Sequence, residues 1–124
     1  MASPRNALSP RSRAYRNPES RPISGRNVVI LPLEHEVPAP PHPPGVDFTR
    51  EESKLWKQLW TSPVGYAWDE VETLAVASYI RYTSMVMSGN GSAWCAQEAR
   101  HLGDALGLTP KGRAALGWQI ETGD

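Results

Sequence analysis

Arginine is the residue type in this chain whose number and placement point most directly to chemistry. Residues 1–31 hold six arginines against one acidic residue, Glu19, a balance of six minus one, or plus five. A guanidinium binds phosphate by charge and by paired hydrogen bonds, without reading base sequence. The segment is therefore predicted to contact DNA, and the alternative is a solvated tail that only aids solubility. The arginines concerned are Arg5, Arg11, Arg13, Arg16, Arg21 and Arg26.

A second basic group consists of Arg50, Lys54 and Lys57, which recur at the spacing of one helix face. We consider this face a candidate for DNA binding. The alternative is an ordinary solvated face, and Glu51 partly neutralises it. From Val46 onward the chain has seven basic and ten acidic residues, or minus three. Bulk charge alone therefore does not predict DNA binding by this part of the chain.

No arrangement of residues typical of an active site is present. The turn Ser88–Ser92 contains glycines but lacks the lysine and the preceding strand of a nucleotide-binding loop. Cys95, the only cysteine, is predicted to be a small core residue rather than a nucleophile. The histidines at positions 35, 42 and 101 are scattered, with no Cys/His spacing that suits zinc. We expect a protein that is not an enzyme and that uses no metal or cofactor.

The composition divides the chain into a tail and a folded part. Ten of the twelve prolines lie in residues 1–44, whereas all five tryptophans lie between Trp56 and Trp118. Proline interrupts helices, and large apolar side chains build a core. We therefore expect a basic, proline-rich arm and linker over residues 1–45 and a helical domain over residues 46–124.

Two segments of the arm have expected roles of their own. The run Pro38–Pro44 favours polyproline II and is predicted to be a semi-rigid spacer that holds the arm about 20 Å from the body. Binding to an SH3-type domain is the alternative for these prolines. The apolar run Val28–Leu33 is too short to form a sheet alone, so it is expected to dock on the helical body or on a neighbouring subunit.

The fold class is predicted to be all-α, a small domain of about four helices with a long, largely irregular N-terminal arm. Capping boxes, formed by Thr49 with Glu52 and by Asp69 with Glu72, predict helices over residues 49–61 and 69–88. The chain is expected to break between them at Pro63 and Gly65. A third helix is predicted over residues 93–106. A short fourth helix after Thr109 is expected to carry Leu116, Trp118 and Ile120.

The helix predicted over residues 69–88 is apolar on more than one side. One stripe is predicted to be its buried face: Val71, Leu74, Ala75, Ser78, Tyr82, Met85 and Val86. A small domain without a disulfide often gains stability by self-association. A second stripe is therefore predicted to be a subunit interface, the alternative being that the remaining helices cover it: Val76, Ile80, Thr83 and Met87.

The segment Leu106–Trp118 combines a helix stop with a helix start. Gly107 suits the left-handed conformation that ends a helix, and Leu108 can fold back on Leu102. Thr109 can cap the next helix, and Pro110 suits its first turn. Arg113 lies in that first turn, where a cation is unfavourable unless a partner compensates. Asp104 and a DNA phosphate are the two candidate partners, and we prefer the internal one.

The phrase Leu106-Gly-Leu-Thr-Pro110 resembles the C-terminal signature of the small subunits of bacteriophage terminases, especially those of phages that infect actinobacteria. Lys54–Trp60 and the apolar helix after Trp68 are similar to that family's first two helices, so the resemblance covers about residues 48–120. The sequence departs from the family pattern at Gly112 and Ala115, where polar or basic residues are more usual. The residues that carry the motif are Gly107, Leu108, Thr109, Pro110, Arg113 and Leu116.

The resemblance implies a non-catalytic subunit that binds double-stranded viral DNA, forms a homo-oligomeric ring and regulates the terminase large subunit, an ATPase and nuclease. It also implies that the C-terminal segment contacts the large subunit. The cytoplasm of the infected bacterial host is the expected compartment, because the sequence shows neither a secretory signal nor an apolar run of membrane-spanning length.

Two other functions remain open. A small helical transcriptional regulator could use residues 69–88 and 93–106 as a helix-turn-helix, with Gln97, Arg100 and His101 as the base-reading groups. A non-DNA adaptor could join partners through its apolar helix and its prolines.

Overall fold

The fold is built from helices around a tryptophan-rich core, with one short strand pair across the helix ends. The computed structural model describes residues 28–122. Its elements, in chain order, are β1 (Val29–Leu31), α1 (Arg50–Trp60), α2 (Pro63–Ala67), the 3-10 helix η2 (Glu70–Glu72), α3 (Thr73–Met87), α4 (Ala93–Ala105), α5 (Pro110–Leu116) and β2 (Trp118–Ile120). The predicted all-α class is confirmed. Within residues 28–122, no helix has both the length and the apolar character needed to cross a bilayer.

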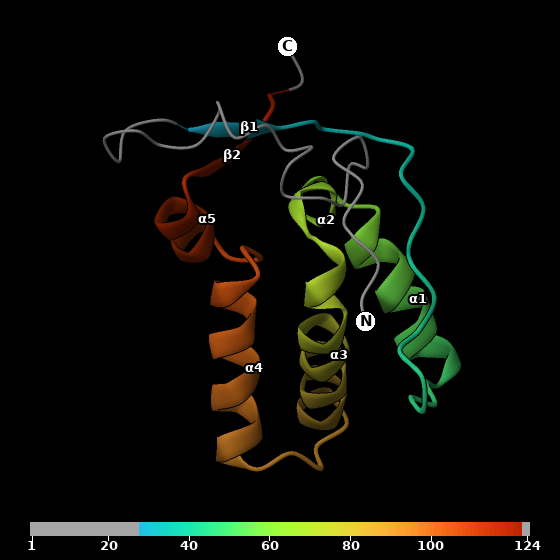
Figure 1. Ribbon diagram of the computed structural model, residues 1–124. Helices are drawn as coiled ribbons and strands as arrows, with labels where there is room; N and C mark the ends of the chain where they lie inside the picture. The colour runs from blue at the N-terminus through green and yellow to red at the C-terminus, as the bar shows by residue number, and fades with distance from the viewer. Residues whose placement is uncertain (1–27, 123–124) are drawn as a thin grey trace.

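Three helices lie side by side, with α3 in the centre. Figure 1 shows α4 running antiparallel to α3 on one side and α1 on the other, while β1 and β2 lie across the upper ends of the helices. The core lies between these elements. Its most deeply buried apolar side chains are Leu31, Trp60, Trp68, Val76 and Ile80.

Both predicted capping boxes are present, and the first long helix begins where predicted. The backbone N–H of Glu52 donates to Thr49 Oγ1 at 3.1 Å, and the N–H of Thr49 donates to Glu52 Oε1 at 2.9 Å. Asp69 and Glu72 form the same reciprocal cap. The turn that follows Asp69 is a 3-10 helix, so α3 itself begins at Thr73.

Residues 63–67, which were expected to break the chain, form the short helix α2 instead. Ser62 Oγ accepts a hydrogen bond from the N–H of Gly65 at 3.1 Å, and Pro63 lies in the first turn, where its missing N–H costs nothing. Gly65 lies against the backbone carbonyls of Leu59 and Trp60, where a Cβ would collide. The proline and the glycine therefore start a helix and let it pack closely on α1.

The two apolar stripes of α3 lie on the opposite sides from those predicted. Val76 and Ile80, expected at a subunit interface, are 0% exposed because they belong to the same core cluster as Trp60 and Trp68. The interface prediction is wrong for these two residues. Thr83 is half-buried, and Met87 alone of the four is largely exposed.

The stripe expected to be buried is largely at the surface. Leu74 is 67% exposed and Val71 59%, while Met85 and Val86 are also classed as exposed. Ser78 is exposed, and Ala75 and Tyr82 are half-buried. The 3.6-residue period was correct, but it did not determine which apolar side of the helix the rest of the chain would cover.

The last helix ends earlier than predicted. Gly117 adopts the left-handed conformation with φ +74° and closes α5 directly after Leu116. Trp118 and Ile120, expected on this helix, lie in β2. They belong to an extended segment because a left-handed residue cannot continue a helix.

The strand pair joins the two distant ends of the described chain. β1 and β2 are parallel, and Val29, Ile30 and Leu31 lie opposite Trp118, Gln119 and Ile120. The N–H of Val29 donates to Gly117 O, and the N–H of Glu121 donates to Leu31 O, both at 2.8 Å. Leu31 is 1% exposed. Of the two destinations expected for Val28–Leu33, the chain's own body is therefore the one observed.

The proline run lies against α1 rather than acting as a spacer. Trp56 Nε1 donates a hydrogen bond to the carbonyl oxygen of Pro40 at 2.8 Å. The ring of His42 contacts the rings of Phe48 and Trp56, with centroids 4.8 and 5.6 Å apart. The predicted 20 Å separation is therefore wrong, and the packed body includes residues 28–45 as well as the helices (Figure 1).

Candidate nucleic-acid interface

The basic face predicted on α1 lies at the surface. Arg50, Lys54 and Lys57 are all exposed, whereas Trp56 and Trp60 on the other side of the helix are buried. Of the two acidic residues in the first turn, Glu51 is exposed and Glu52 is buried. The outer face therefore carries three cations against one exposed carboxylate, which suits contact with phosphate groups.

The other predicted DNA contacts lie outside the described residues. They are Arg5, Arg11, Arg13, Arg16, Arg21 and Arg26. Of the residues predicted to bind DNA, the structure therefore describes those of α1: Arg50, Lys54 and Lys57.

A groove borders the basic face of α1. It has a volume of about 540 Å³ and lies between α1 and the proline run, with Pro38, His42, Trp56 and Lys57 among its lining residues. Lys57 therefore lies at the boundary between the basic face of α1 and this groove. Sequence reasoning missed this groove because it placed the prolines away from the body.

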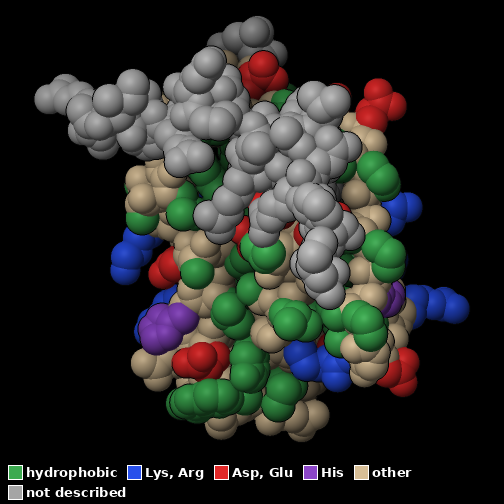
Figure 2. Space-filling model, viewed as in Figure 1, with side chains coloured by type: hydrophobic (Ala, Val, Ile, Leu, Met, Phe, Trp, Pro, Cys, Tyr) green, Lys and Arg blue, Asp and Glu red, His purple; other side chains and the backbone are tan. Residues whose placement is uncertain are grey.

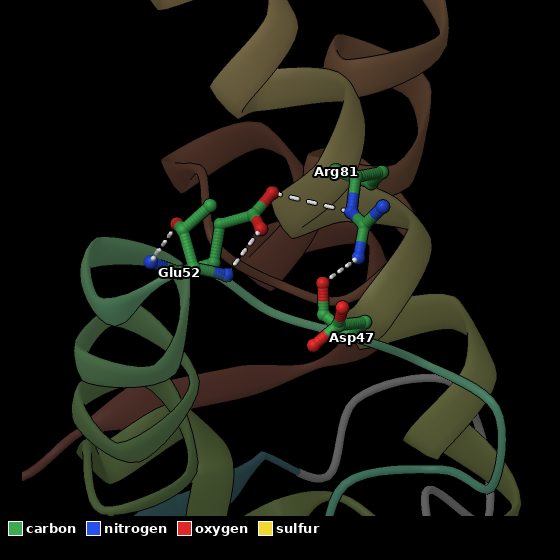
Figure 3. Close-up of polar contacts among 4 residues, drawn as sticks. Asp47, Glu52 and Arg81 are labelled. Carbon is green, nitrogen blue, oxygen red and sulfur yellow. Dashed lines mark hydrogen bonds and ion pairs between the residues drawn. The ribbon is translucent and has the colours of Figure 1, made fainter.

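A buried carboxylate ties the start of α1 to the middle of α3 (Figure 3). Arg81 Nε lies 3.2 Å from Glu52 Oε2, and Arg81 Nη2 donates to the carbonyl oxygen of Asp47 at 3.0 Å. The guanidinium also lies over the ring of Phe48. Glu52 thus caps its own helix and pairs with α3. The sequence pattern predicted only the cap. Arg81 is the sole charged residue between Thr73 and Gln97, and a lone charge in an apolar helix indicates that it has a charged partner.

The motif residues meet at the junction of α4 and α5. Gly107 has φ +79°, and the N–H of Leu108 donates to Gly103 O at 2.8 Å, which closes α4 as expected. Thr109 Oγ1 accepts from the N–H of Gly112 at 2.9 Å and donates to Asp104 Oδ1 at 2.5 Å. Pro110 occupies the first turn of α5. The predicted stop and start are both confirmed.

Arg113 has an internal partner, but that partner differs from the expected one. Its Nη1 donates to the carbonyl oxygen of Gly107 at 3.2 Å. Asp104, the predicted partner, instead accepts the hydrogen bond of Thr109. Arg113 therefore satisfies a carbonyl at the end of α4. Because α5 is short, Arg113 belongs to its last turn, where a cation is favourable, and not to the first turn as predicted.

Packing at this junction also explains two small residues. A Cβ on Gly107 would lie 2.6 Å from the ring of Trp118 and 3.3 Å from Leu116 Cδ1. A Cβ on Gly112 would lie 2.9 Å from both the Cα and the carbonyl carbon of Asp104. Position 112 therefore cannot present a polar or basic side chain to DNA in this chain, whereas Ala115 is exposed.

The geometry of α3 and α4 does not match a helix-turn-helix. The two helices form an antiparallel hairpin joined by the turn at residues 88–92 (Figure 1), whereas a helix-turn-helix joins helices at about 90–120°. Gln97, Arg100 and His101 are exposed on α4. These three side chains are therefore at the surface, but α4 is not oriented relative to α3 as the recognition helix of a helix-turn-helix is.

Within residues 28–122, no group of three or more His, Cys, Asp or Glu side chains is placed to hold a metal ion. Cys95 is buried, as predicted. Comparison of the chain with protein-family models, with curated proteins and with solved structures gives no match.

Proposed function

We propose that this chain is the small subunit of a viral DNA-packaging terminase. In this proposal it binds double-stranded viral DNA at the start of packaging, assembles into a homo-oligomeric ring, and recruits and regulates the large ATPase-nuclease subunit. It acts in the cytoplasm of the infected bacterial host and has no catalytic activity of its own.

The observation that carries the proposal is the resemblance of Leu106–Trp118 to the terminase signature. The motif residues Gly107, Thr109, Pro110 and Arg113 form one continuous junction, in which each contributes a hydrogen bond or a backbone conformation. The resemblance thus falls on residues with connected structural roles. It extends upstream over α1 and α3.

Phosphate binding is assigned to the arginines of residues 1–26 and to the basic face of α1. Each cation alone contributes little, because contacts with phosphate are weak and screened by salt. In an assembly, many copies of both groups act on one duplex, and linked weak contacts gain strongly in affinity. Self-association and DNA binding therefore support each other in this proposal.

The salt dependence of DNA binding tests the two basic groups separately. Replacing Arg50, Lys54 and Lys57 together by glutamine should lower the slope of log affinity against log salt by about 3, since each phosphate contact contributes about 0.9. Replacing the six arginines of residues 1–26 should lower it by about 5 for the same reason. Fluorescence anisotropy with a labelled duplex measures both slopes.

The matched control replaces Arg100 and Lys111, which are exposed cations outside α1. Their replacement by glutamine should leave the slope unchanged. A wild-type affinity that does not respond to salt, or an equal loss in the control, would remove these basic groups from the mechanism. Light scattering after size exclusion tests assembly: a discrete mass of many subunits supports the ring, and a monomer contradicts it.

A further inference from the structure

One side of α3 is an apolar surface that the described chain leaves uncovered. Leu74, Ser78 and Met85 recur at the spacing of one face of α3, and all three are exposed. Val71, which lies in η2 just before α3, is exposed as well. In Figure 2 hydrophobic side chains gather over α3 and over the lower ends of α3 and α4. Trp94 of α4, which is 57% exposed, extends this surface through its ring contact with Tyr82.

α3 itself carries very little charge, although the exposed Asp47 of the preceding loop borders Ser78 and Arg81. Arg81 is the only charged residue between Thr73 and Gln97, and its charge is already paired with that of Glu52. Interface centres in proteins are typically depleted of charged residues and enriched in aromatic residues, methionine and arginine. The composition of this face is therefore that of a contact surface rather than of a solvated helix.

The face is symmetric about Ser78. Consider two copies of α3 that run antiparallel and cross at Ser78. A residue that lies n positions before Ser78 in one copy then lies opposite the residue n positions after Ser78 in the other, so the two residue numbers sum to 156. Leu74 then meets Tyr82 of the other copy, and Tyr82 meets Leu74. The small side chain at the crossing point lets the two helices approach closely, and large apolar groups meet on both sides of it. A two-fold interface needs this kind of self-complementary surface.

The same symmetry keeps like charges apart. Arg81 lies opposite Ala75 of the other copy, because 75 and 81 also sum to 156. The two guanidiniums are thus separated by six residues along the helix, about 9 Å at 1.5 Å per residue. In Figure 3 Arg81 is held by Glu52 and by the backbone of Asp47, with its third nitrogen directed away from both. The cation is fixed at the edge of the contact rather than at its centre.

We propose that α3 pairs with α3 of a second copy of this chain, antiparallel and crossing at Ser78. This inference rests on the self-association part of the proposed function, names one of its contacts, and does not depend on DNA binding. A two-fold contact closes at two copies, so a ring needs a second, different interface beside it. The stripe that the sequence predicts to be buried is then buried after all, by another copy of the chain. A single helix face is small for an interface, so the dimer should dissociate at micromolar concentration.

A cysteine placed on the symmetry axis tests the geometry. In a Cys95→Ala background, Ser78→Cys should form a disulfide-linked dimer under mild oxidation, because the two side chains meet at the crossing. Ala115→Cys, also exposed but on α5, should not. Equal cross-linking of both variants, or none in the Ser78→Cys variant, would overturn the proposed crossing.

The solution mass tests the surface. Light scattering from micromolar to submillimolar protein should show that the chain at least dimerises as its concentration rises. Leu74→Ser should raise the dissociation constant of the dimer by about tenfold or more. The matched control is Ile30→Ser, which removes a similarly exposed apolar side chain from β1 and should change nothing. A monomer at every concentration overturns both this inference and the proposed assembly. A larger assembly that survives Leu74→Ser overturns only the α3 pairing.

Discussion

At the residue scale, the junction of α4 and α5 depends on positions where a side chain has no room. Gly112 lies on the backbone of Asp104, and Gly107 lies under the ring of Trp118. Glycine at a helical position usually lowers helix stability by about 1 kcal/mol relative to alanine. At position 112 close approach outweighs that preference, because the first turn of α5 packs directly on the last turn of α4.

We therefore expect Gly112→Ala to lower the free energy of unfolding by about 1–3 kcal/mol, through overpacking against Asp104. Gly103→Ala is the matched control, because its Cβ would meet nothing closer than Tyr79 Cε1 at 3.4 Å. That change should be neutral or stabilising. Urea denaturation followed by tryptophan fluorescence measures both, and a gain in stability from both changes would contradict the account of position 112.

At the element scale, the parts of the fold that depend on near neighbours could be predicted from the sequence. Thr49 with Glu52, and Thr109 with Gly112, are close in the chain, and their capping bonds form as expected. The side of α3 that enters the core could not be predicted, because two of its sides are apolar. The α1 groove depends on Trp56 bonding Pro40, 16 positions away, and no local pattern encodes that contact.

The contact between the proline run and α1 predicts a difference between two tryptophans. Trp56→Phe should lower stability by about 1–2 kcal/mol, since it leaves the carbonyl of Pro40 without the indole N–H. Trp94→Phe should change stability by less than about 0.5 kcal/mol, because Trp94 is more than half exposed. Thermal unfolding at low protein concentration, where self-association is minimal, measures the two, and equal effects would argue against the Pro40 contact.

At the scale of the whole molecule, the strand pair makes residues 28–33 part of the body. Consecutive residues of β1 point to opposite faces, so Leu31 enters the core while Ile30 faces outward. The core of this small domain therefore depends on a segment that composition assigns to the arm. Prolines mark where helices are interrupted, not where packing stops, so packed residues extend N-terminal to the predicted division at residue 45.

Neighbouring substitutions in β1 should accordingly differ strongly. Leu31→Ala should lower the free energy of unfolding by about 2–5 kcal/mol, as expected for a buried leucine that leaves a cavity. Ile30→Ala should cost less than about 0.5 kcal/mol, because its side chain is more than half exposed. Chemical denaturation of both variants provides the measurement, and a similar loss in each would show that β1 does not dock in the observed register.

The strand pair also bears on the order of folding events. Beside the strands, the backbone N–H of Leu33 donates a hydrogen bond to the side chain of Glu121, and these two residues are 88 positions apart. Closing so long a loop costs entropy before any contact compensates, whereas the α3–α4 hairpin closes across a short turn. We expect the hairpin to form early and β1 to join β2 late. Disruption of the strands should then mainly speed unfolding, so they determine how long the folded chain lasts rather than how fast it forms.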